Sequence, residues 1–238
     1  LIISSYKTVH GVMRNCYGYV FKYNDKKIVF TGDTTICDNL LDNIIDADYL
    51  ICDATNKIGN NFHLGVDDIK TFLNRRLNGE IYIKDVVKVD DNFHARYDVI
   101  KKEYRYYINM GKFNPIEKDY VYQYNKKLDI NKMRKASKLF VGKHDFRAFC
   151  SNEKEKINCI RNIYKIKIIK HNDKLELIFV GNGFLKHMVR NIVGILLKVG
   201  SNLLTVDEVK MILDEKTRQH NTKPVPGNGL YLQNVYYK

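Results

Sequence analysis

Along much of the chain, apolar and polar residues alternate with the two-residue period of a half-buried β-strand. The segments with this pattern, or with a short continuous apolar run, are residues 17–23, 27–30, 49–51, 163–168, 175–180 and 230–237. Two pairs of these segments are separated by short turns, at Asn24-Asp25 and at residues 171–173, which predicts two β-hairpins. The run 49–51 is wholly apolar and predicts a short buried strand.

Other segments have the apolar spacing of helices, with helix signals at some of their ends. They are residues 39–45, 130–141, 184–199 and a segment that begins after Thr205. Asp129 can cap the second of these helices, which Gly142 ends. Thr205 and Glu208 form a capping box at the start of the last one. Helices combined with antiparallel strand pairs predict an α+β fold built in layers.

The composition is that of a folded protein. Hydrophobic residues make up 45% of the 238 positions, which is enough for one large core or two small ones. The longest apolar runs end well short of the roughly 20 residues that a membrane-spanning helix needs, and the first residues lack a signal-peptide pattern. The five cysteines contain no C-x-x-C pair, which favours a reducing compartment. We therefore expect a cytoplasmic protein without a membrane-spanning segment.

The net charge of +13 is confined to one part of the chain. Residues 1–66 contain six Lys and Arg against seven Asp and Glu, whereas residues 67–238 contain 34 against 20. A basic excess, in a chain with 17 Tyr and 11 Phe, suits a surface that binds phosphates and stacks on unpaired bases. A merely solvated basic surface is the alternative that charge alone leaves open.

Polar residues interrupt the otherwise apolar helix predicted at residues 184–199. At helical spacing, His187, Arg190 and Asn191 share one face, so we expect Arg190 to point into a cleft or an ion pair. A buried arginine needs a carboxylate or phosphate partner. Spacing alone leaves two interpretations open, a structural salt bridge and a ligand-binding cation.

Five ordered stretches resemble motifs of the tRNA pseudouridine synthase A family. They are residues 92–96 (NFHAR), 104–107 (YRYY), 142–149 (GKHDFRAF), 181–194 (GNGFLKHMVRNIVG) and 229–232 (GLYL). The resemblance covers residues 68–238 and implies an antiparallel or mixed sheet flanked by helices. It also implies an isomerase that converts uridine to pseudouridine in the anticodon stem-loop of tRNA, with neither metal nor cofactor.

The resemblance assigns roles to individual residues. Arg190 matches the family arginine that pairs with a nucleophilic aspartate and keeps it ionised. Tyr104 matches the tyrosine that packs on the flipped-out base, although spacing alone leaves a core tyrosine open. Leu232 lies in the motif that lines the same pocket. The other residues that the resemblance assigns to RNA or substrate binding are His94, Arg96, Arg105 and His187.

The R-T-D motif, which by the same resemblance carries the nucleophilic aspartate, is absent from these 238 residues. Asp98 follows Arg96 with a similar spacing, but it belongs to a segment that comes after the nucleophile in the family. The resemblance therefore implies an arginine and a tyrosine without the carboxylate that they serve. A synthase that is inactive in this form and a non-catalytic RNA-binding module are both left open.

Residues 1–66 resemble part of a metallo-β-lactamase-fold hydrolase of the ribonuclease Z kind. The stretches that carry this resemblance are residues 15–19 (NCYGY), 31–34 (TGDT) and 47–55 (ADYLICDAT). It implies zinc, with Asp33 as a metal-bridging carboxylate, His10 as an imidazole ligand and His63 as a later histidine near the substrate. The H-x-H-x-D-H cluster of that fold is absent, so we expect a weak, incomplete site. A metal-dependent hydrolase is the third function left open.

Two domains are therefore predicted. Residues 1–66 are an incomplete metallo-β-lactamase-like αβ segment, and residues 67–238 are the catalytic domain of a pseudouridine synthase. Because both families are represented by fragments, a junction created by a deletion or a frameshift is favoured over a purposeful fusion. The expected partner is tRNA, and a homodimer is left open.

Overall fold

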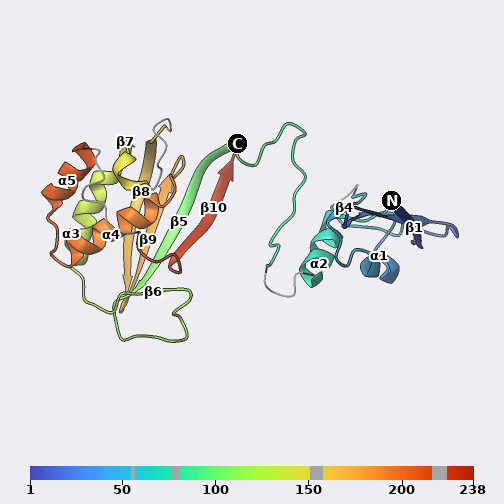
Figure 1. Cartoon of the computed structure of the whole chain (residues 1–238), viewed down its shortest axis with the longest axis horizontal. Helices are drawn as coiled ribbons and strands as arrows, with labels where there is room; N and C mark the ends of the chain where they lie inside the picture. Colours follow the sequence, from blue (N-terminus) through green and yellow to red (C-terminus); the bar gives the residue numbers. More distant parts are fainter. Residues whose placement is uncertain (55–56, 77–80, 151–157, 216–223) are drawn as a thin grey trace. The chain divides into compact units, whose positions relative to one another are not determined.

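The computed structural model describes residues 1–54, 57–76, 81–150, 158–215 and 224–238. Its backbone contacts divide the chain into two units, Leu1–Asp91 and Asn92–Lys238, here named unit 1 and unit 2 (Figure 1). Each unit has its own β-sheet and its own hydrophobic core. Both combine strands with helices, so the predicted α+β class is confirmed.

The described residues of unit 1 form a four-stranded sheet with two helices. In sheet order the strands are β1 (Ile2–Lys7), β2 (Tyr17–Tyr23), β3 (Lys26–Phe30) and β4 (Tyr49–Ile51), and the helices are α1 (Asp38–Asn43) and α2 (Val66–Arg76). The first three strands pair antiparallel, and β3 pairs with β4 in parallel. Its buried core residues are Tyr6, Val20, Val29, Leu40, Ile44 and Leu64. These side chains come from one face of the sheet, from the α1 region and, for Leu64, from just before α2, and Figure 1 shows α1 and α2 on the same side of the sheet.

The predicted β2–β3 hairpin is present. Asn24 and Asp25 have positive φ angles of 46° and 59°, as a two-residue type I′ turn requires. Strand β4 has its predicted bounds, but its predicted burial is wrong, because Tyr49 and Ile51 are 59% and 52% exposed. The helices cover only the opposite face of the sheet, so these two side chains have no layer above them.

In its described residues, unit 2 is a six-stranded mixed sheet with three α-helices. Its strands are β5 (Val99–Asn109), β6 (Tyr122–Gln123), β7 (Gly142–Asp145), β8 (Ile160–His171), β9 (Lys174–Gly181) and β10 (Leu230–Tyr237). Its helices are α3 (Ile130–Ser137), α4 (Met188–Gly200) and α5 (Val206–Glu215), with 3₁₀ turns at Lys138–Phe140 and Arg147–Phe149. The sheet order is β10-β5-β9-β8-β7 with antiparallel neighbours, and β6 pairs with β5 in parallel.

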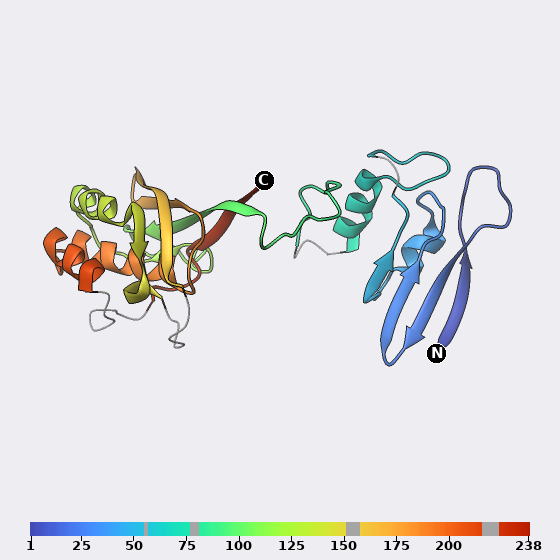
Figure 2. The same ribbon diagram turned by 90° about the horizontal axis from the view of Figure 1, so that it is seen from above.

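The three α-helices of unit 2 pack on one face of its sheet (Figures 1 and 2). Eleven of the 13 residues of α4 are buried, so this helix lies at the centre of the core. The side chains that β9 turns toward it, Leu175, Leu177 and Phe179, are fully buried. Because removing apolar surface from water is the main driving force of folding, this packing holds α4 firmly against the sheet.

The two predicted N-terminal helix caps of unit 2 are confirmed, whereas α3 ends at Ser137 and not at Gly142, because a 3₁₀ turn follows it at Lys138–Phe140. The Asp129 carboxylate accepts a hydrogen bond from the Lys132 backbone N–H at 3.0 Å, and Thr205 and Glu208 exchange the hydrogen bonds of a capping box. The predicted start of the helix at residue 184 is wrong. His187 has a left-handed φ of 62°, which a right-handed helix cannot include, so α4 begins at Met188. His187 therefore does not share a helical face with Arg190.

The compact units divide after Asp91, whereas the domain boundary at residues 66 and 67 is predicted from family resemblance and stays a prediction. Helix α2 begins at Val66, and its Ile69 and Leu73 pack against the core of unit 1. A helix belongs with the core that buries its apolar side chains, so α2 is part of unit 1. The contacts accordingly place the change between units after Asp91.

Two features bear on the expectations from composition. None of the five cysteines is in a disulfide. Across the described ranges, no helix combines the length and the apolar composition that crossing a bilayer would require.

Candidate active site

A cavity of about 270 Å³ lies in unit 2 where the sheet meets the start of α4. Its lining comes from Tyr104 of β5, Leu230 of β10 and residues 184–190 before and within α4. Pockets for drug-sized ligands measure roughly 300–1,000 Å³, so this cavity suits a single small group. Leu232, predicted to line it, lies opposite Tyr104 in the β5–β10 register but is 51% exposed and outside the lining.

Tyr104 is held in place from both sides of its strand. It lies opposite Leu232 on β10 and opposite Phe179 on β9. Its ring meets the Phe184 ring edge to face, with the centroids 5.2 Å apart. Burial raises the pKa of the Tyr104 hydroxyl above its ordinary value, so the phenol is neutral at pH 7. The side chain therefore offers a fixed, uncharged aromatic surface to the cavity.

Arg190 brings a positive charge to the same cavity. Its Nε donates a hydrogen bond to the backbone carbonyl of Val225 at 2.5 Å. A Cβ added at Gly227 would lie 3.8 Å from its Nη1, so the backbone at Gly227 passes close to the guanidinium. None of the ion pairs between described residues includes Arg190. Of the two interpretations left open by spacing, the described contacts support a cation that can receive an anionic group.

The segment before β10 positions the carbonyl that holds Arg190. Pro226 accepts a hydrogen bond from the Tyr106 hydroxyl at 2.6 Å, and Gly229 accepts one from the Tyr107 N–H at 2.8 Å. A Cβ at Gly229 would lie 2.6 Å from the Tyr107 carbonyl, so only glycine fits there. The motif 229–232 indicated this glycine. The role of the Val225 carbonyl could not be predicted from the sequence, because every residue has a backbone carbonyl.

His187 and Asn191 differ in their surroundings although both lie near Arg190 in sequence. Burial lowers the pKa of the His187 imidazole below its ordinary value, and the charges of Arg190 and Lys186 lower it further. His187 is therefore neutral at pH 7 and lines the cavity. Asn191 is buried, and its Nδ2 donates to the Phe149 carbonyl at 2.7 Å, which ties α4 to the neighbouring 3₁₀ turn. Asn191 thus supports the helix rather than the cavity.

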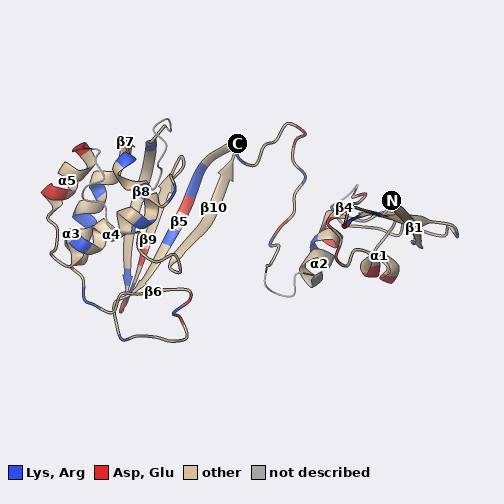
Figure 3. Cartoon of the chain, in the orientation of Figure 1, with Lys and Arg blue, Asp and Glu red and all other residues tan. Residues whose placement is uncertain are grey.

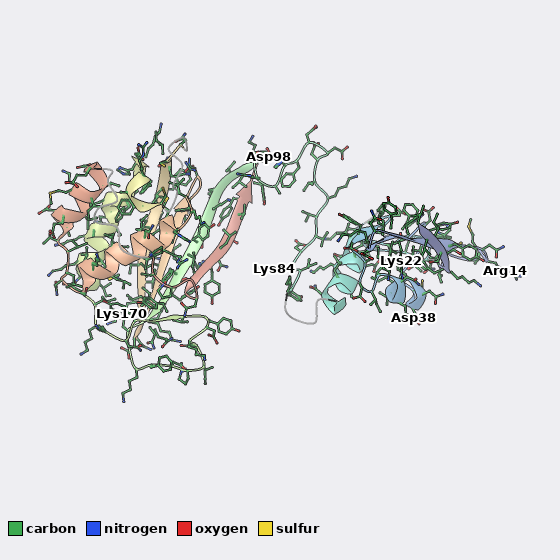
Figure 4. All side chains as sticks on the ribbon, in the orientation of Figure 1. Arg14, Lys22, Asp38, Lys84, Asp98 and Lys170 are labelled. Atoms are coloured by element: carbon green, nitrogen blue, oxygen red, sulfur yellow. The ribbon has the colours of Figure 1, made fainter. Side chains whose placement is uncertain are left out.

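His94 and Arg96 lie in an exposed loop before β5, away from the cavity. The His94 N–H donates to the Asp98 carboxylate at 2.7 Å, and His94 Nδ1 accepts from the Arg96 N–H at 3.1 Å. Asp98 is at the start of β5 (Figure 4). Tyr104 lies six positions further along, or about 20 Å in an extended strand. A single ligand that touches both the loop and the cavity must therefore be extended.

Arg105 points to the opposite face of β5 from Tyr104, as adjacent strand residues do. Its guanidinium pairs with Glu103 at 2.9 Å and with Glu176 at 2.8 Å. The hydrogen bond to Glu103 is the main reason that the pKa of Arg105 is raised. The structure therefore gives Arg105 carboxylate partners within unit 2, and its predicted contact with RNA stays a prediction.

Unit 1 contains a separate cluster of possible metal ligands. Ligand atoms of Asp33, Asp53 and His63 all lie within 4.8 Å of one another. His63 Nδ1 lies 2.7 Å from an Asp53 carboxylate oxygen. The His10 ring centroid is 5.0 Å from that of His63, and His10 Nδ1 lies 2.7 Å from the Phe62 carbonyl oxygen. Of the two predicted ligands, Asp33 is thus in the cluster and His10 lies beside it, while Asp53 had been given no role.

The division into units sharpens the charge difference along the chain. Unit 1 contains 11 Lys and Arg against 13 Asp and Glu, whereas unit 2 contains 29 against 14. Figure 3 shows Lys and Arg on both helices and strands of unit 2, including α3 and β5. The unit that carries the cavity is therefore the one that attracts polyanions.

Comparisons with known proteins point to one family. A family described as tRNA pseudouridine synthase matches residues 136–238. The chain is 47% identical over 166 residues to tRNA pseudouridine synthase A 1 of Bacillus cereus (strain ATCC 14579), a match that covers 69% of the chain and 67% of the relative. It is 42% identical over 175 residues to tRNA pseudouridine synthase A of Geobacillus sp. (strain WCH70), covering 73% and 71%. It is also 40% identical over 166 residues to tRNA pseudouridine synthase A of Bacillus subtilis (strain 168), covering 69% and 67%.

The matches to these relatives are longer than unit 2. A match over 69% of the chain is longer than unit 2, residues 92–238, so it extends back into unit 1. The similarity therefore begins before the change between compact units. None of these matches carries the metallo-β-lactamase resemblance of residues 1–66, which stays a prediction.

We expect the substitution Arg190→Met to raise the pKa of His187 part of the way toward its ordinary value. Removing the cation removes its repulsion of the imidazolium, whereas the larger effect of burial remains. The measurement is an NMR titration of the His187 ring protons. Lys174→Met, which removes a cation from the far end of β9, is the matched control and should leave the titration unchanged. An unaltered His187 pKa in Arg190→Met would contradict the electrostatic account.

Proposed function

The chain belongs to the tRNA pseudouridine synthase A family, a family of isomerases, and we propose that unit 2 presents one tRNA uridine to the cavity between Tyr104 and Arg190. The observation that carries this proposal is the meeting, in one small cavity, of a fixed aromatic ring and a cation that forms no ion pair with a carboxylate of the described residues. The basic excess of unit 2 supports a polyanionic substrate. A cytoplasmic location, where tRNA is modified, is part of the same proposal.

The reaction sets clear demands on such a site. The C1′–N1 bond of the uridine breaks and a C1′–C5 bond forms, while the C5 proton leaves and N1 gains a proton. A base in a stack cannot turn in this way, so it must first leave the stack, at a cost of about a few kcal/mol. In our proposal the Tyr104 ring stacks on the displaced uracil and offsets part of that cost.

The loop with His94 and Arg96 suits the rest of the RNA. It is exposed and lies about 20 Å along β5 from the cavity, by the rise of an extended strand. When a uridine occupies the cavity, the RNA backbone on either side of it is long enough to reach this loop. We propose that Arg96 binds a phosphate there, as a guanidinium does with two parallel hydrogen bonds.

Two further residues belong to the same proposed RNA surface. His187 lines the cavity, and Leu232 lies beside Tyr104. The anticodon stem-loop is the proposed region of the tRNA.

Catalysis in this proposal requires an aspartate that pairs with Arg190. The family resemblance pairs this arginine with a nucleophilic aspartate, and no carboxylate among the described residues forms an ion pair with it. Asp98 is unsuited to that role, because its carboxylate accepts from the His94 N–H and pairs with Lys238 at the start of β5. We propose that full activity depends on an aspartate brought to Arg190, and that tRNA binding does not.

A metal site in unit 1 is a second candidate function, favoured by the cluster of Asp33, Asp53 and His63. Two carboxylates and an imidazole are suitable zinc ligands, and three protein ligands are the number found in catalytic zinc sites. The proposal is therefore a zinc ion held by these three residues, with His10 next to it, as in a hydrolase of the metallo-β-lactamase fold.

Binding of tRNA should weaken steeply with salt and should depend on Tyr104. We expect the dissociation constant to rise roughly 100-fold between 50 and 200 mM salt, as about four phosphate contacts would require. Tyr104→Ala should weaken binding about tenfold, because stacking on one base contributes roughly 1–3 kcal/mol. Filter binding of unmodified tRNA measures both effects.

Tyr164→Ala is the matched control, since Tyr164 is an exposed tyrosine of β8 outside the cavity lining. Equal affinities of the two variants would instead support an RNA-binding module that does not use the cavity. Binding that is absent or insensitive to salt would contradict the proposal altogether.

Isomerisation by the chain alone should be far slower than by its relatives. We expect little release of tritium from tRNA labelled at uridine C5, because no carboxylate of the described residues forms an ion pair with Arg190. The Bacillus subtilis relative is the positive control in the same assay. Release at a comparable rate would show that a carboxylate of this chain does reach Arg190.

Zinc should bind the full chain with a stoichiometry near one. Elemental analysis after dialysis against zinc, together with calorimetry, measures this. Asp33→Asn and His63→Ala should each weaken binding about tenfold or more by removing one ligand. Asp42→Asn, which neutralises an exposed aspartate of α1, is the control and should bind as the unchanged chain does. Full retention of zinc by Asp33→Asn would place the metal elsewhere, for example on the cysteines.

A further inference from the structure

The orientation of Arg190 in the cavity depends on an uncharged partner. No ion pair between described residues includes this arginine, and its Nε donates to the Val225 carbonyl at 2.5 Å. A hydrogen bond weakens steeply when its donor and acceptor are misaligned. The guanidinium therefore keeps one orientation only while the Val225 carbonyl stays in place.

Residues 224–229 carry this carbonyl, and several hydrogen bonds tie them to the rest of unit 2. The Asn228 side chain and the Gly229 carbonyl are bonded to neighbouring segments, three and four residues after Val225. The Tyr106 hydroxyl donates to the Pro226 carbonyl at 2.6 Å, one residue after Val225. Of the described bonds from other segments to residues 224–229, this is the one next to the carbonyl that holds the arginine.

The link between the Val225 and Pro226 carbonyls is stiff. The peptide bond that joins the two residues is planar, and the proline ring fixes φ of Pro226 at about −65°. One soft rotation, about ψ of Pro226, is left between the two carbonyl groups. A hydroxyl that holds the second carbonyl therefore also restricts the first.

The position of Tyr106 is itself fixed. Its side chain is fully buried in the core of unit 2, and a Cβ added at Gly229 would lie 3.1 Å from its ring, so residues 224–229 pass close to it. Burial raises the pKa of the Tyr106 phenol, Tyr122 raises it further, and the positive charge of Arg190 offsets part of this rise. The phenol therefore keeps its proton at pH 7 and remains a hydrogen-bond donor.

We infer that Tyr106 is a positioning residue for Arg190. Its hydroxyl holds the Pro226 carbonyl, the stiff link holds the Val225 carbonyl, and that carbonyl orients the guanidinium. Tyr106 does not line the cavity, so it acts through Arg190 and not on a substrate. The consequence for isomerisation rests on the function proposed above, in which Arg190 meets an aspartate, whereas the positioning itself does not.

The experiment is an NMR titration of the His187 ring protons in the full chain without RNA. His187 reports on Arg190, because the charge of Arg190 lowers the pKa of His187. In Tyr106→Phe the guanidinium should move partly into water, so the pKa of His187 should rise by about half of the shift that Arg190→Met produces. In the double variant the pKa should equal that of Arg190→Met alone, because Tyr106 acts through this cation.

Tyr107→Phe is the matched control. Tyr107 is the next residue of β5, and its hydroxyl donates to Glu176 at 3.3 Å on the opposite face of the sheet. The substitution removes the same chemical group and keeps the backbone N–H, so the pKa of His187 should not change. Amide exchange of β5 and α4 checks that each variant is folded.

Three results would overturn the inference. They are an unaltered His187 pKa in folded Tyr106→Phe, a shift that remains in the Arg190→Met background, and an equal shift in Tyr107→Phe. Pro226→Gly, at an exposed position, frees the stiff link without touching the core and should raise the pKa in the same direction. If Tyr106→Phe does not fold, an unaltered pKa in Pro226→Gly decides against the inference. Since no RNA is present, these results do not depend on whether the chain binds tRNA.

Discussion

Strand β5 is hydrogen-bonded along one edge to β9 and along the other to β10, and this double pairing determines the geometry of unit 2. A slip of one residue would turn every side chain of the strand to the opposite face. Tyr104 would then leave the cavity, and Arg105 would lose Glu176. Tyr106 would leave the core and release the Pro226 carbonyl. The core, the aromatic surface of the cavity and the segment that holds Arg190 therefore depend on one register.

The electrostatics of the cavity follow from the placement of α4. The start of this helix carries the positive end of its dipole, and Lys186 and Arg190 add two charges beside it. The described contact of Arg190 is with a backbone carbonyl, which holds the guanidinium without neutralising it. Burial lowers the pKa of His187, and the positive charges of Arg190 and Lys186 lower it further. An anionic group that enters this cavity is stabilised, and a further cation is not.

The similarity to tRNA pseudouridine synthases and the compact packing divide the chain at different places. The matched relatives extend into unit 1, whereas α2 packs Ile69 and Leu73 on the core of unit 1. A helix joins the core that buries its apolar side chains, whichever family its sequence resembles. The sheet of unit 1 also presents apolar side chains on the face that its helices do not cover, among them Phe30 and Tyr49.

Local patterns in the sequence determined the features that depend on residues a few positions apart. The Asn24-Asp25 turn, the Asp129 cap and the Thr205–Glu208 capping box are such features. Motifs also identified Arg190 and Tyr104, which lie in one cavity. Only the tertiary structure brought Val225 to Arg190, Glu176 to Arg105 and Asp53 to Asp33, because contacts between distant residues have no local signature. The left-handed backbone of His187 and the exposure of the β4 side chains likewise depend on the tertiary packing around them.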